Sequence, residues 1–342
     1  MQGNQIETEF NKHFTHGYLT TETLGDMYNK STFERILVIG IGGSALSGTL
    51  LSTLMKEIDD SIDVFIHRTY DLPARSIYSK ALVILISYSG NTEEVLDAYQ
   101  EASRKNLPII AMTSGGQLEQ YAHKDKTPLF LLPKGMKPRF SLMYQIGALI
   151  AILENTNIIQ SQKHIVEKLQ QNDYNKISHE AQKAIDHIGA NTPLIYASSK
   201  YASLAYIIKI QMNENAKIHA FSNIFPETNH NEIMGHTTDP KSAHYGGILL
   251  RSQDDDPRIQ HQQDIFIEIL EEHGNTIHSI DITGATCYNT IFQGVLLGHL
   301  MSFHLAKQRN INPYQTTAIE ECKKRINKKT APTTKLKQSI HS

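Results

Sequence analysis

The sequence predicts an α/β protein made of two parallel sheets, each flanked by helices. Short runs rich in β-branched residues alternate with longer helix-patterned stretches from about Arg35 onward, which is typical of parallel strands joined by crossover helices. At roughly 150 residues per domain, the 342 residues correspond to two domains. A hydrophobic content of 40% is enough for a large buried core.

The first half of the chain is expected to hold five strands separated by helices. Helical patterns cover Ala45–Lys56 and Thr92–Asn106, and the second of these carries two carboxylates in its first turn, which suits the positive end of a helix dipole. A long apolar helical stretch then runs from Phe140 to Glu154. The expected strands are Ile36–Ile39, Asp63–Ile66, Leu82–Ile86, Ile109–Met112 and Leu129–Leu131.

The second half of the chain repeats the order of the first. A polar amphipathic helix over His164–Ile188 separates the halves. The second series of elements begins with PLIYASS and continues as a helix near Tyr201–Asn215 before the repeated unit. That unit is a strand, a helix, a second strand and a glycine-containing turn, and it covers residues 82–116 and again 247–284. In the second copy the strands are GGILL and NTIHSIDI, and the helix is Pro257–Glu272. The repetition predicts two subdomains of the same architecture.

Six parts of the chain are therefore expected. A final helix near His299–Gln308 is followed by a short one around Thr317–Asn327, and beyond it the chain has too few apolar residues to fold. The parts are an N-terminal extension over residues 1–34, a first subdomain over 35–155, a connector helix over 156–190, a second subdomain over 191–310, a C-terminal helix over 311–327 and a disordered tail over 328–342.

Charge and composition exclude several classes of protein. The 33 Lys and Arg residues nearly balance the 35 Asp and Glu residues, so the net charge of -2 does not suggest a nucleic-acid or anionic-membrane surface. The longest apolar stretch, Ile146–Leu153, is far shorter than the ~18 residues of a membrane span. The N-terminus lacks the features of a secretory signal, and Cys287 and Cys322 are expected to be reduced thiols. We therefore expect a soluble cytoplasmic protein without nucleic-acid or membrane partners.

A glycine-rich segment, GIGGSA, directly follows the first expected strand and begins a helix. It contains Gly42, Gly43 and Ser44, and glycine allows an anion to approach the backbone N–H groups closely. The segment satisfies the G-x-G-x-x-A pattern, but the next strand ends at His67 and Arg68, where a dinucleotide site would have an acidic residue. Taken alone, the segment is compatible with a dinucleotide site, a phosphosugar site or a tight structural turn.

A second loop, SYSGNT, ends the next strand-like run and again begins a helix. Ser87, Ser89 and Thr92 present three hydroxyls beside free backbone donors, which suits one phosphate monoester without lysine or metal. Ser and Thr also cap helices for structural reasons, but a cap uses one hydroxyl, so we favour phosphate binding. The corresponding loop of the second half is RSQDDD, whose carboxylates would repel an anion. Only the first subdomain is expected to bind phosphate.

These motifs resemble the sugar isomerase (SIS) domain proteins, and in particular the bifunctional phosphoglucose/phosphomannose isomerases. GIGGSALSG is similar to the family's GMGGSGIAGD element and SYSGNT to its phosphate loop, and the resemblance covers about Arg35 to Arg325. It implies two tandem SIS subdomains with flavodoxin-like, doubly wound sheets. It also implies a hexose phosphate substrate, no cofactor, a homodimer and a role in carbohydrate metabolism, in glycolysis or gluconeogenesis.

The resemblance further implies which residues carry the chemistry. Moving a carbonyl between C1 and C2 of a sugar phosphate needs a base, a donor for ring opening and a positive charge that stabilises the enediolate. Glu214, in an Asn-Glu-Asn element, matches the family's catalytic base. His230, in the segment PETNHNEIMG, matches the residue that opens the sugar ring, which in related isomerases comes from the partner subunit. Arg139, which follows a proline, matches the arginine that faces the enediolate.

The C-terminal segment resembles the family's closing element, in which a threonine lies seven residues before a lysine. Thr316 with Lys323 has this spacing, and Thr317 with Lys324 is the competing frame. The resemblance implies that Lys323 supplies a further catalytic cation. It also implies that Thr316 lies in the substrate pocket, because the family's tolerance of both glucose and mannose phosphates is associated with a small threonine there.

The expected function is aldose–ketose isomerisation of hexose 6-phosphates by a metal-free enediol mechanism. Glu227, Glu232 and His236 lie near the ring-opening histidine and could instead hold a metal, but no H-E-x-x-H or similar ligand spacing accompanies them. Two other classes of protein compete with this expectation. One is a non-catalytic sugar-phosphate sensor, and the other is a nucleotide-dependent oxidoreductase that would rest on the glycine-rich segment alone.

Overall fold

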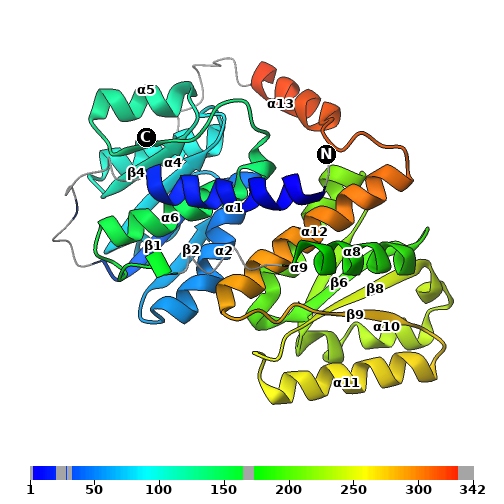
Figure 1. Ribbon diagram of the computed structural model, residues 1–342. Coiled ribbons are helices and arrows are strands. Elements are labelled where there is room, and N and C mark those ends of the chain that lie inside the picture. The colour runs from blue at the N-terminus through cyan, green and yellow to red at the C-terminus, as the bar shows by residue number, and fades with distance from the viewer. Residues whose placement is uncertain (1–2, 21–27, 29–32, 165–172, 330–342) are drawn as a thin grey trace, which may run out of the picture.

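The computed structural model describes residues 3–20, 28, 33–164 and 173–329. It confirms the predicted α/β class, because the described chain forms two parallel sheets with helices packed on both faces of each (Figure 1). The first sheet is drawn in blue and cyan and the second in green and yellow, and they lie side by side in one body joined by a shared core.

The first sheet has the strand order β2-β1-β3-β4-β5. All its pairs are parallel, and β3 (Ala81–Ser87) is buried along its whole length, which explains why its sequence is a continuous apolar run. Since β1 (Arg35–Ile39) pairs with β3, the loops that follow these two strands leave the same edge of the sheet as neighbours. The other strands are β2 (Asp63–His67), β4 (Ile109–Thr113) and β5 (Leu129–Leu131).

The second sheet has the strand order β7-β6-β8-β9 and is also parallel. This is the same neighbour order as that of the first four strands of the first sheet, so the predicted repeat is confirmed. One strand, β7 (Phe221–Phe225), was not expected, because only its last residue is fully buried and its apolar pattern is weak. The other strands are β6 (Thr192–Ser198), β8 (Tyr245–Arg251) and β9 (Ile277–Asp281).

One large hydrophobic core joins the two sheets, and smaller cores cover their remaining faces. The small cores form under α4 (Glu93–Arg104) and α5 (Gly116–Asp125) on the first sheet, and under α11 (Pro257–Glu272) on the second. The large core takes side chains from one face of each sheet and from six of the described helices, which are α1 (Gly3–Leu19), α2 (Gly43–Ile58), α6 (Leu142–Asn155), α8 (Tyr174–Ile188), α9 (Ala202–Gln211) and α12 (Cys287–Gln308). The described parts of α3 (Arg75–Tyr78), α10 (Ile233–Thr238) and α13 (Thr317–Lys329) supply none of the fully buried apolar residues of these cores.

The helix α1 packs along α6 and contributes Phe14, which is 1% exposed, to the large core (Figure 1). Two glycines allow this close contact. A Cβ on Gly17 would lie 2.0 Å from the backbone oxygen of Tyr144, and a Cβ on Gly147 would lie 2.1 Å from the backbone oxygen of Phe14. Any larger residue at either glycine would therefore force the two helices apart.

Several helix boundaries differ from those predicted. The helix α12 begins at Cys287, far before the predicted start near His299, and Thr286 caps it by accepting a hydrogen bond from the backbone N–H of Asn289. The predicted continuous helix over 164–188 is wrong at Asp173, which is extended and caps α8 by accepting a hydrogen bond from the backbone N–H of Lys176, so α8 begins at residue 174; residues 165–172 lie outside the described ranges. The predicted disordered tail is wrong at residues 328–329, which belong to α13, and the rest of it lies outside the described residues.

Within the described ranges, none of the helices has both the length and the apolar character needed to cross a bilayer. Cys287 and Cys322 are free. Burial raises the pKa of the Cys287 thiol to about 12, so this side chain is a neutral, half-buried part of the packing.

Candidate active site

The glycine-rich segment forms the turn between β1 and α2. Gly42 has a φ of +58°, a left-handed conformation that favours glycine. A Cβ on Gly43 would lie 2.9 Å from the backbone nitrogen of Arg139, so this glycine lets the turn contact the arginine segment directly. Ser44 is buried, and its hydroxyl accepts a hydrogen bond of 3.3 Å from the backbone N–H of Tyr88. The turn is thereby fixed between the arginine and the second predicted loop.

The hydroxyls of the SYSGNT loop are not used as helix caps. Thr92 is the N-cap residue of α4, but its side chain makes no capping hydrogen bond. Its hydroxyl instead lies 2.9 Å from that of Ser87, which is almost fully buried. Ser89 is exposed, and its hydroxyl accepts a hydrogen bond of 3.3 Å from the backbone N–H of Asn91. This arrangement leaves hydroxyl hydrogens and the N-terminus of a helix available to an anion.

A third loop, which the sequence analysis did not single out, supports the SYSGNT loop. A Cβ on Gly90 would lie 1.7 Å from the backbone oxygen of Gly115, and a Cβ on Gly116 would lie 2.4 Å from that of Ser89. All three glycines have positive φ. The pair of glycines after β4, at the edge of the sheet where the other two loops emerge, is the signal that could have identified this loop from the sequence.

Arg139 is the centre of the site. Its side chain is 5% exposed, and its guanidinium donates to the side-chain oxygen of Asn215 at 2.8 Å and to the backbone oxygen of Pro313 at 2.7 Å. A third nitrogen lies 3.5 Å from the Glu214 carboxylate. Burial lowers the pKa of Arg139 from its ordinary value, while the Glu214 charge opposes that shift, so the group remains a cation at neutral pH.

Glu214 owes its position to a change in helix type. The helix α9 ends at Gln211 and continues as a π-helix over Met212–Ala216, and single π turns are often found at functional sites. The Glu214 side chain is 23% exposed, whereas the neighbouring Asn215 is fully buried and donates to the Ser302 hydroxyl at 2.9 Å. The asparagine therefore anchors the turn, and the glutamate faces the arginine with access to solvent.

Lys217, which the sequence analysis did not select, lies directly behind this pair. Its ammonium donates to the backbone oxygen of Glu214 and lies 3.5 Å from that of Pro313. Burial and the positive charge of Arg139 lower the pKa of Lys217. Two cations thus hold the Pro313 carbonyl, and this contact docks the C-terminal segment beside the glutamate.

Thr316 lies at the start of that segment's helix and contacts a second cation that was not predicted. Lys137 donates to the Thr316 hydroxyl at 3.4 Å and pairs with Glu320 at 3.3 Å, and Thr316 itself donates to Glu320 at 2.7 Å. Because Lys137 precedes Arg139 by two residues, these interactions hold Thr316 beside the arginine segment.

The helix α13 carries the other predicted residues of the C-terminal segment, Thr317, Lys323 and Lys324. Among the described residues, no hydrogen bond or ion pair links Lys323 to Arg139 or Glu214.

His230 is exposed at the end of the short helix Glu227–His230 that follows β7 in the second subdomain. The hydrogen bonds and ion pairs of the described residues do not join it to Glu214 or Arg139, so the structure does not bring this predicted residue together with the others within one chain. Within the same ranges, no three His, Cys, Asp or Glu side chains are grouped so as to hold a metal ion.

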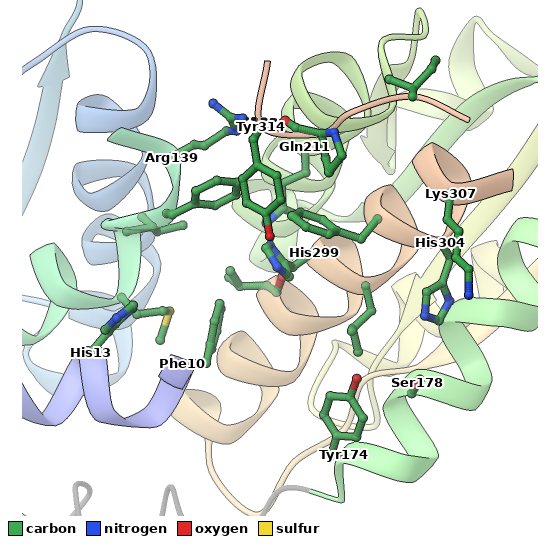
Figure 2. Close-up of a pocket in the computed structure, with 18 of the residues that line it drawn as sticks. Phe10, His13, Arg139, Tyr174, Ser178, Gln211, His299, His304, Lys307 and Tyr314 are labelled. Atoms are coloured by element: carbon green, nitrogen blue, oxygen red, sulfur yellow. Dashed lines mark hydrogen bonds between the residues drawn. The ribbon is translucent and has the colours of Figure 1, made fainter. Parts of the chain in front are cut away.

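A cavity of about 870 Å³ lies against the other side of the arginine. Figure 2 shows Arg139 and Tyr314 at one end of it and Tyr174 and Ser178 at the other. Near Arg139 its wall is aromatic, because the Phe140 ring lies 4.5 Å from the guanidinium carbon and packs edge-on against Tyr314. Burial and the nearby Arg139 charge lower the pKa of His299 in this wall to about 4, so the imidazole is neutral. The packing fixes the orientation of the arginine.

Two family models match the chain. Residues 31–127 match the SIS domain, and residues 177–326 match the bacterial phospho-glucose isomerase C-terminal SIS domain. The fold and site thus define a tandem SIS-domain enzyme of the sugar-phosphate isomerase class. A bifunctional phosphoglucose/phosphomannose isomerase from Thermoplasma volcanium is 33% identical over 297 residues, which are 86% of this chain and 92% of that protein. This chain belongs to the bifunctional phosphoglucose/phosphomannose isomerase family.

Other similar proteins show how widely this architecture is used. A D-glucosamine-6-phosphate 4-epimerase from Sulfolobus acidocaldarius is 34% identical over 61% of this chain and 66% of its own length. The crystal structure of a hypothetical protein from Thermus thermophilus superposes with a TM-score of 0.67 over 96% of this chain and 95% of that one, at 16% identity. At that identity the likeness shows the fold alone.

Proposed function

We propose that this protein interconverts glucose 6-phosphate with fructose 6-phosphate, and mannose 6-phosphate with fructose 6-phosphate, through an enediolate and without a metal. The observation that carries the proposal is the Glu214 carboxylate 3.5 Å from the buried Arg139 guanidinium, beside the glycine-rich turn that contacts the same arginine. A base and a fixed positive charge are the two groups that proton transfer between C1 and C2 requires. A sugar-phosphate sensor would need neither.

The proposal assigns named groups to phosphate binding and to proton transfer. Ser87, Ser89 and Thr92 hold the phosphate at the N-terminus of α4. Glu214 removes the proton from one carbon and returns it to the other, and Arg139 stabilises the oxyanion that forms meanwhile. Because guanidinium remains charged at any working pH, it does this without losing a proton.

Two further roles extend the proposal to a second copy of the chain and to the C-terminal helix. His230, exposed in the second subdomain, opens the sugar ring in the site of a partner subunit, which makes the active protein a homodimer. Lys323, on α13, supplies a further cation to the site. The contacts of Thr316 with Lys137 and Glu320 support the frame that pairs Thr316 with Lys323.

The engaged side chains around His230 support the metal-free form of the reaction. The Glu227 carboxylate accepts from Asn231, Glu232 accepts from Tyr196, and His236 bonds the same tyrosine. The groups from which a metal site would be built are therefore already partners of other side chains.

The proposed function is tested by a coupled assay of the purified protein with glucose 6-phosphate and with mannose 6-phosphate, each with and without exhaustive EDTA treatment. Fructose 6-phosphate is expected from both sugars in both conditions. Glucosamine 6-phosphate serves as the comparison substrate, because one relative is an epimerase of that compound. No turnover of either hexose phosphate, or turnover that needs added Zn²⁺, would contradict the proposal.

Replacing both Ser89 and Thr92 with alanine is expected to raise KM about tenfold or more, with a smaller effect on kcat. The reason is that these hydroxyls hold the same phosphate in the ground state and in the transition state. Each lost hydrogen bond to a charged group is worth about 1.5 to 3 kcal/mol. Steady-state kinetics measure the change. The matched control is Ser61→Ala with Thr127→Ala, because these residues precede β2 and β5 at the opposite edge of the parallel sheet. Unchanged KM and kcat would remove the loop from the site.

Replacing Thr316 with glutamine is expected to depress the mannose 6-phosphate reaction selectively. Glucose 6-phosphate and mannose 6-phosphate differ only at C2, which is planar in the enediolate, so one base can serve both if the intermediate has room to rotate. A bulkier side chain at the docked Thr316 removes that room. The ratio of kcat/KM for the two sugars measures the effect, with Thr317→Gln as control because Thr317 is exposed. The opposite result, an effect at Thr317 alone, would favour the competing frame.

A further inference from the structure

The turn that carries His230 is held rigidly to its own subdomain. Every other polar side chain from Glu227 to Glu232 makes a hydrogen bond. Thr228 donates to the backbone oxygen of Ile224 at 3.0 Å, Asn229 donates to that of Gln262 at 3.2 Å, and Asn231 donates to Glu227 at 2.5 Å. His230 is thus an exposed side chain on a turn whose other polar side chains are fixed.

Glu232 makes the strongest of these attachments. One of its carboxylate oxygens accepts a hydrogen bond of 2.7 Å from the Tyr196 hydroxyl, and the other accepts one of 2.5 Å from the Asn223 side chain. Tyr196 lies on β6 and is fully buried, and Asn223 lies on the neighbouring strand β7. Burial and the Glu232 charge raise the pKa of Tyr196 well above its usual range, so the tyrosine keeps its proton and remains the donor.

His236 continues this chain of hydrogen bonds. Its Nε2 lies 2.7 Å from the Tyr196 hydroxyl oxygen. The single tyrosine proton points to Glu232, so the imidazole must carry its own proton on Nε2 and donate it to the tyrosine. Burial lowers the pKa of His236, which keeps the ring neutral. Asn275 donates to the His236 backbone oxygen at 2.7 Å and holds the residue in place.

Aromatic rings keep water away from this network. The Phe266 ring centroid lies 5.6 Å from that of Tyr196 and 5.7 Å from that of His236, and Phe225 packs edge-on against Phe266. A hydrogen-bond chain that ends on a carboxylate gains strength in such an apolar setting, and it also sets one geometry. The chain runs from His236 through Tyr196 to Glu232, two residues after His230.

We infer that His236, Tyr196 and Glu232 are positioning residues that hold the His230 turn in the geometry needed for opening the sugar ring. This rests on the proposed function, in which His230 opens the ring. The proposed function assigns the phosphate and the reacting carbons to other residues, so the network acts through the turn. A displacement of a reacting group by about 1 Å can cost 10²-fold in rate, so loss of the network is expected to slow ring opening.

Ring opening can be measured apart from isomerisation by following the exchange of the α and β anomers of glucose 6-phosphate by NMR. The measurement is made in Glu214→Gln enzyme, in which proton transfer between C1 and C2 is silenced. Into this background are introduced Tyr196→Phe, which removes the central hydroxyl, and Glu232→Gln, which keeps the shape of the side chain. His230→Asn defines the rate without the ring-opening group.

The matched control is Tyr99→Phe. Tyr99 is a fully buried tyrosine whose hydroxyl also bonds a carboxylate, that of Asp125, but it lies in the first subdomain, on the buried face of α4. The two tyrosine substitutions remove the same atom from similar surroundings. Thermal unfolding of both variants measures the loss of stability that each causes.

Catalysed anomerisation is expected to fall at least about tenfold in Tyr196→Phe and in Glu232→Gln, and to stay within about twofold in Tyr99→Phe. If Tyr196→Phe does not fold, the anomerisation rate of Glu232→Gln alone tests the inference. Unchanged anomerisation in the network variants overturns the inference, as does an equal loss in Tyr99→Phe or full anomerisation in His230→Asn. The proposed function fails separately, if the unaltered protein isomerises neither hexose phosphate.

Discussion

Glu214→Gln enzyme is expected to lose about 10² to 10⁴ in kcat for glucose 6-phosphate, with little change in KM. Glutamine keeps the size of the side chain but cannot accept the proton, while the phosphate loop is untouched. The ion pair with Arg139 is lost as well, although this pair is not needed to anchor the turn, because Asn215 does so. The readouts are kcat and the exchange of the C2 hydrogen of the substrate with deuterated solvent.

A suitable control for this variant is Glu154→Gln. Glu154 is a partly buried carboxylate that accepts hydrogen bonds from Tyr18 and from the backbone of Gln162, at the end of α6. It should retain full activity. Exchange at C2 that persists in Glu214→Gln would eliminate Glu214 as the base and leave Glu227 as the next carboxylate to examine.

Arg139→Lys is expected to lower kcat by about 10² to 10³, the cost of removing one group that stabilises an oxyanion. Lysine keeps the charge, but its ammonium cannot reach Asn215, Pro313 and Glu214 from one planar group. The Asn215 oxygen would then lack its donor in a buried site, and the Pro313 oxygen would keep only Lys217, so the free energy of unfolding should also fall, by about 1 to 3 kcal/mol.

Steady-state kinetics and thermal unfolding separate these two effects of Arg139→Lys. The matched control is Arg251→Lys, because Arg251 is a partly buried arginine paired with Asp264 at 2.7 Å in the second subdomain. It should lose stability without losing activity. If Arg139→Lys is destabilised yet fully active, the arginine is only structural.

The glycine-rich turn and the SYSGNT loop could be predicted because they follow strands with clear apolar sequence patterns. Ile84 and Ile86 of β3 are fully buried within a strand that is apolar throughout, and the end of that strand places SYSGNT. The topology then puts the glycine-rich turn beside it, since β1 and β3 are neighbours. Local sequence patterns thus predicted the side of the site that is formed by these two loops.

The side of the site that holds Arg139 and the C-terminal segment depends on contacts between segments that are distant in sequence. Nothing in the sequence near Arg139 indicates that its guanidinium reaches the backbone oxygen of Pro313. Likewise, nothing near Lys137 indicates that its ammonium contacts the Thr316 hydroxyl. The start of α12 was missed for a related reason. Gly294 and Gly298 weaken a helix by about 1 kcal/mol each, yet they are retained because Leu204 packs where the Cβ of Gly294 would be. Tertiary packing outweighs local propensity there.

The π turn at Met212–Ala216 has a consequence for how this chain tolerates changes in length. Such a turn holds one residue more than the α-helical turn that it replaces. If a single residue is deleted from α9 or from the start of the turn, the turn can close as a regular α-helix, and the side chains between the deletion and the end of the turn, Glu214 among them, rotate by ~100°. Glu214 would then point away from the guanidinium even though every site residue was still present. A one-residue deletion here is therefore expected to be as damaging as losing the glutamate itself, whereas substitutions at the exposed positions of α9 leave the register intact.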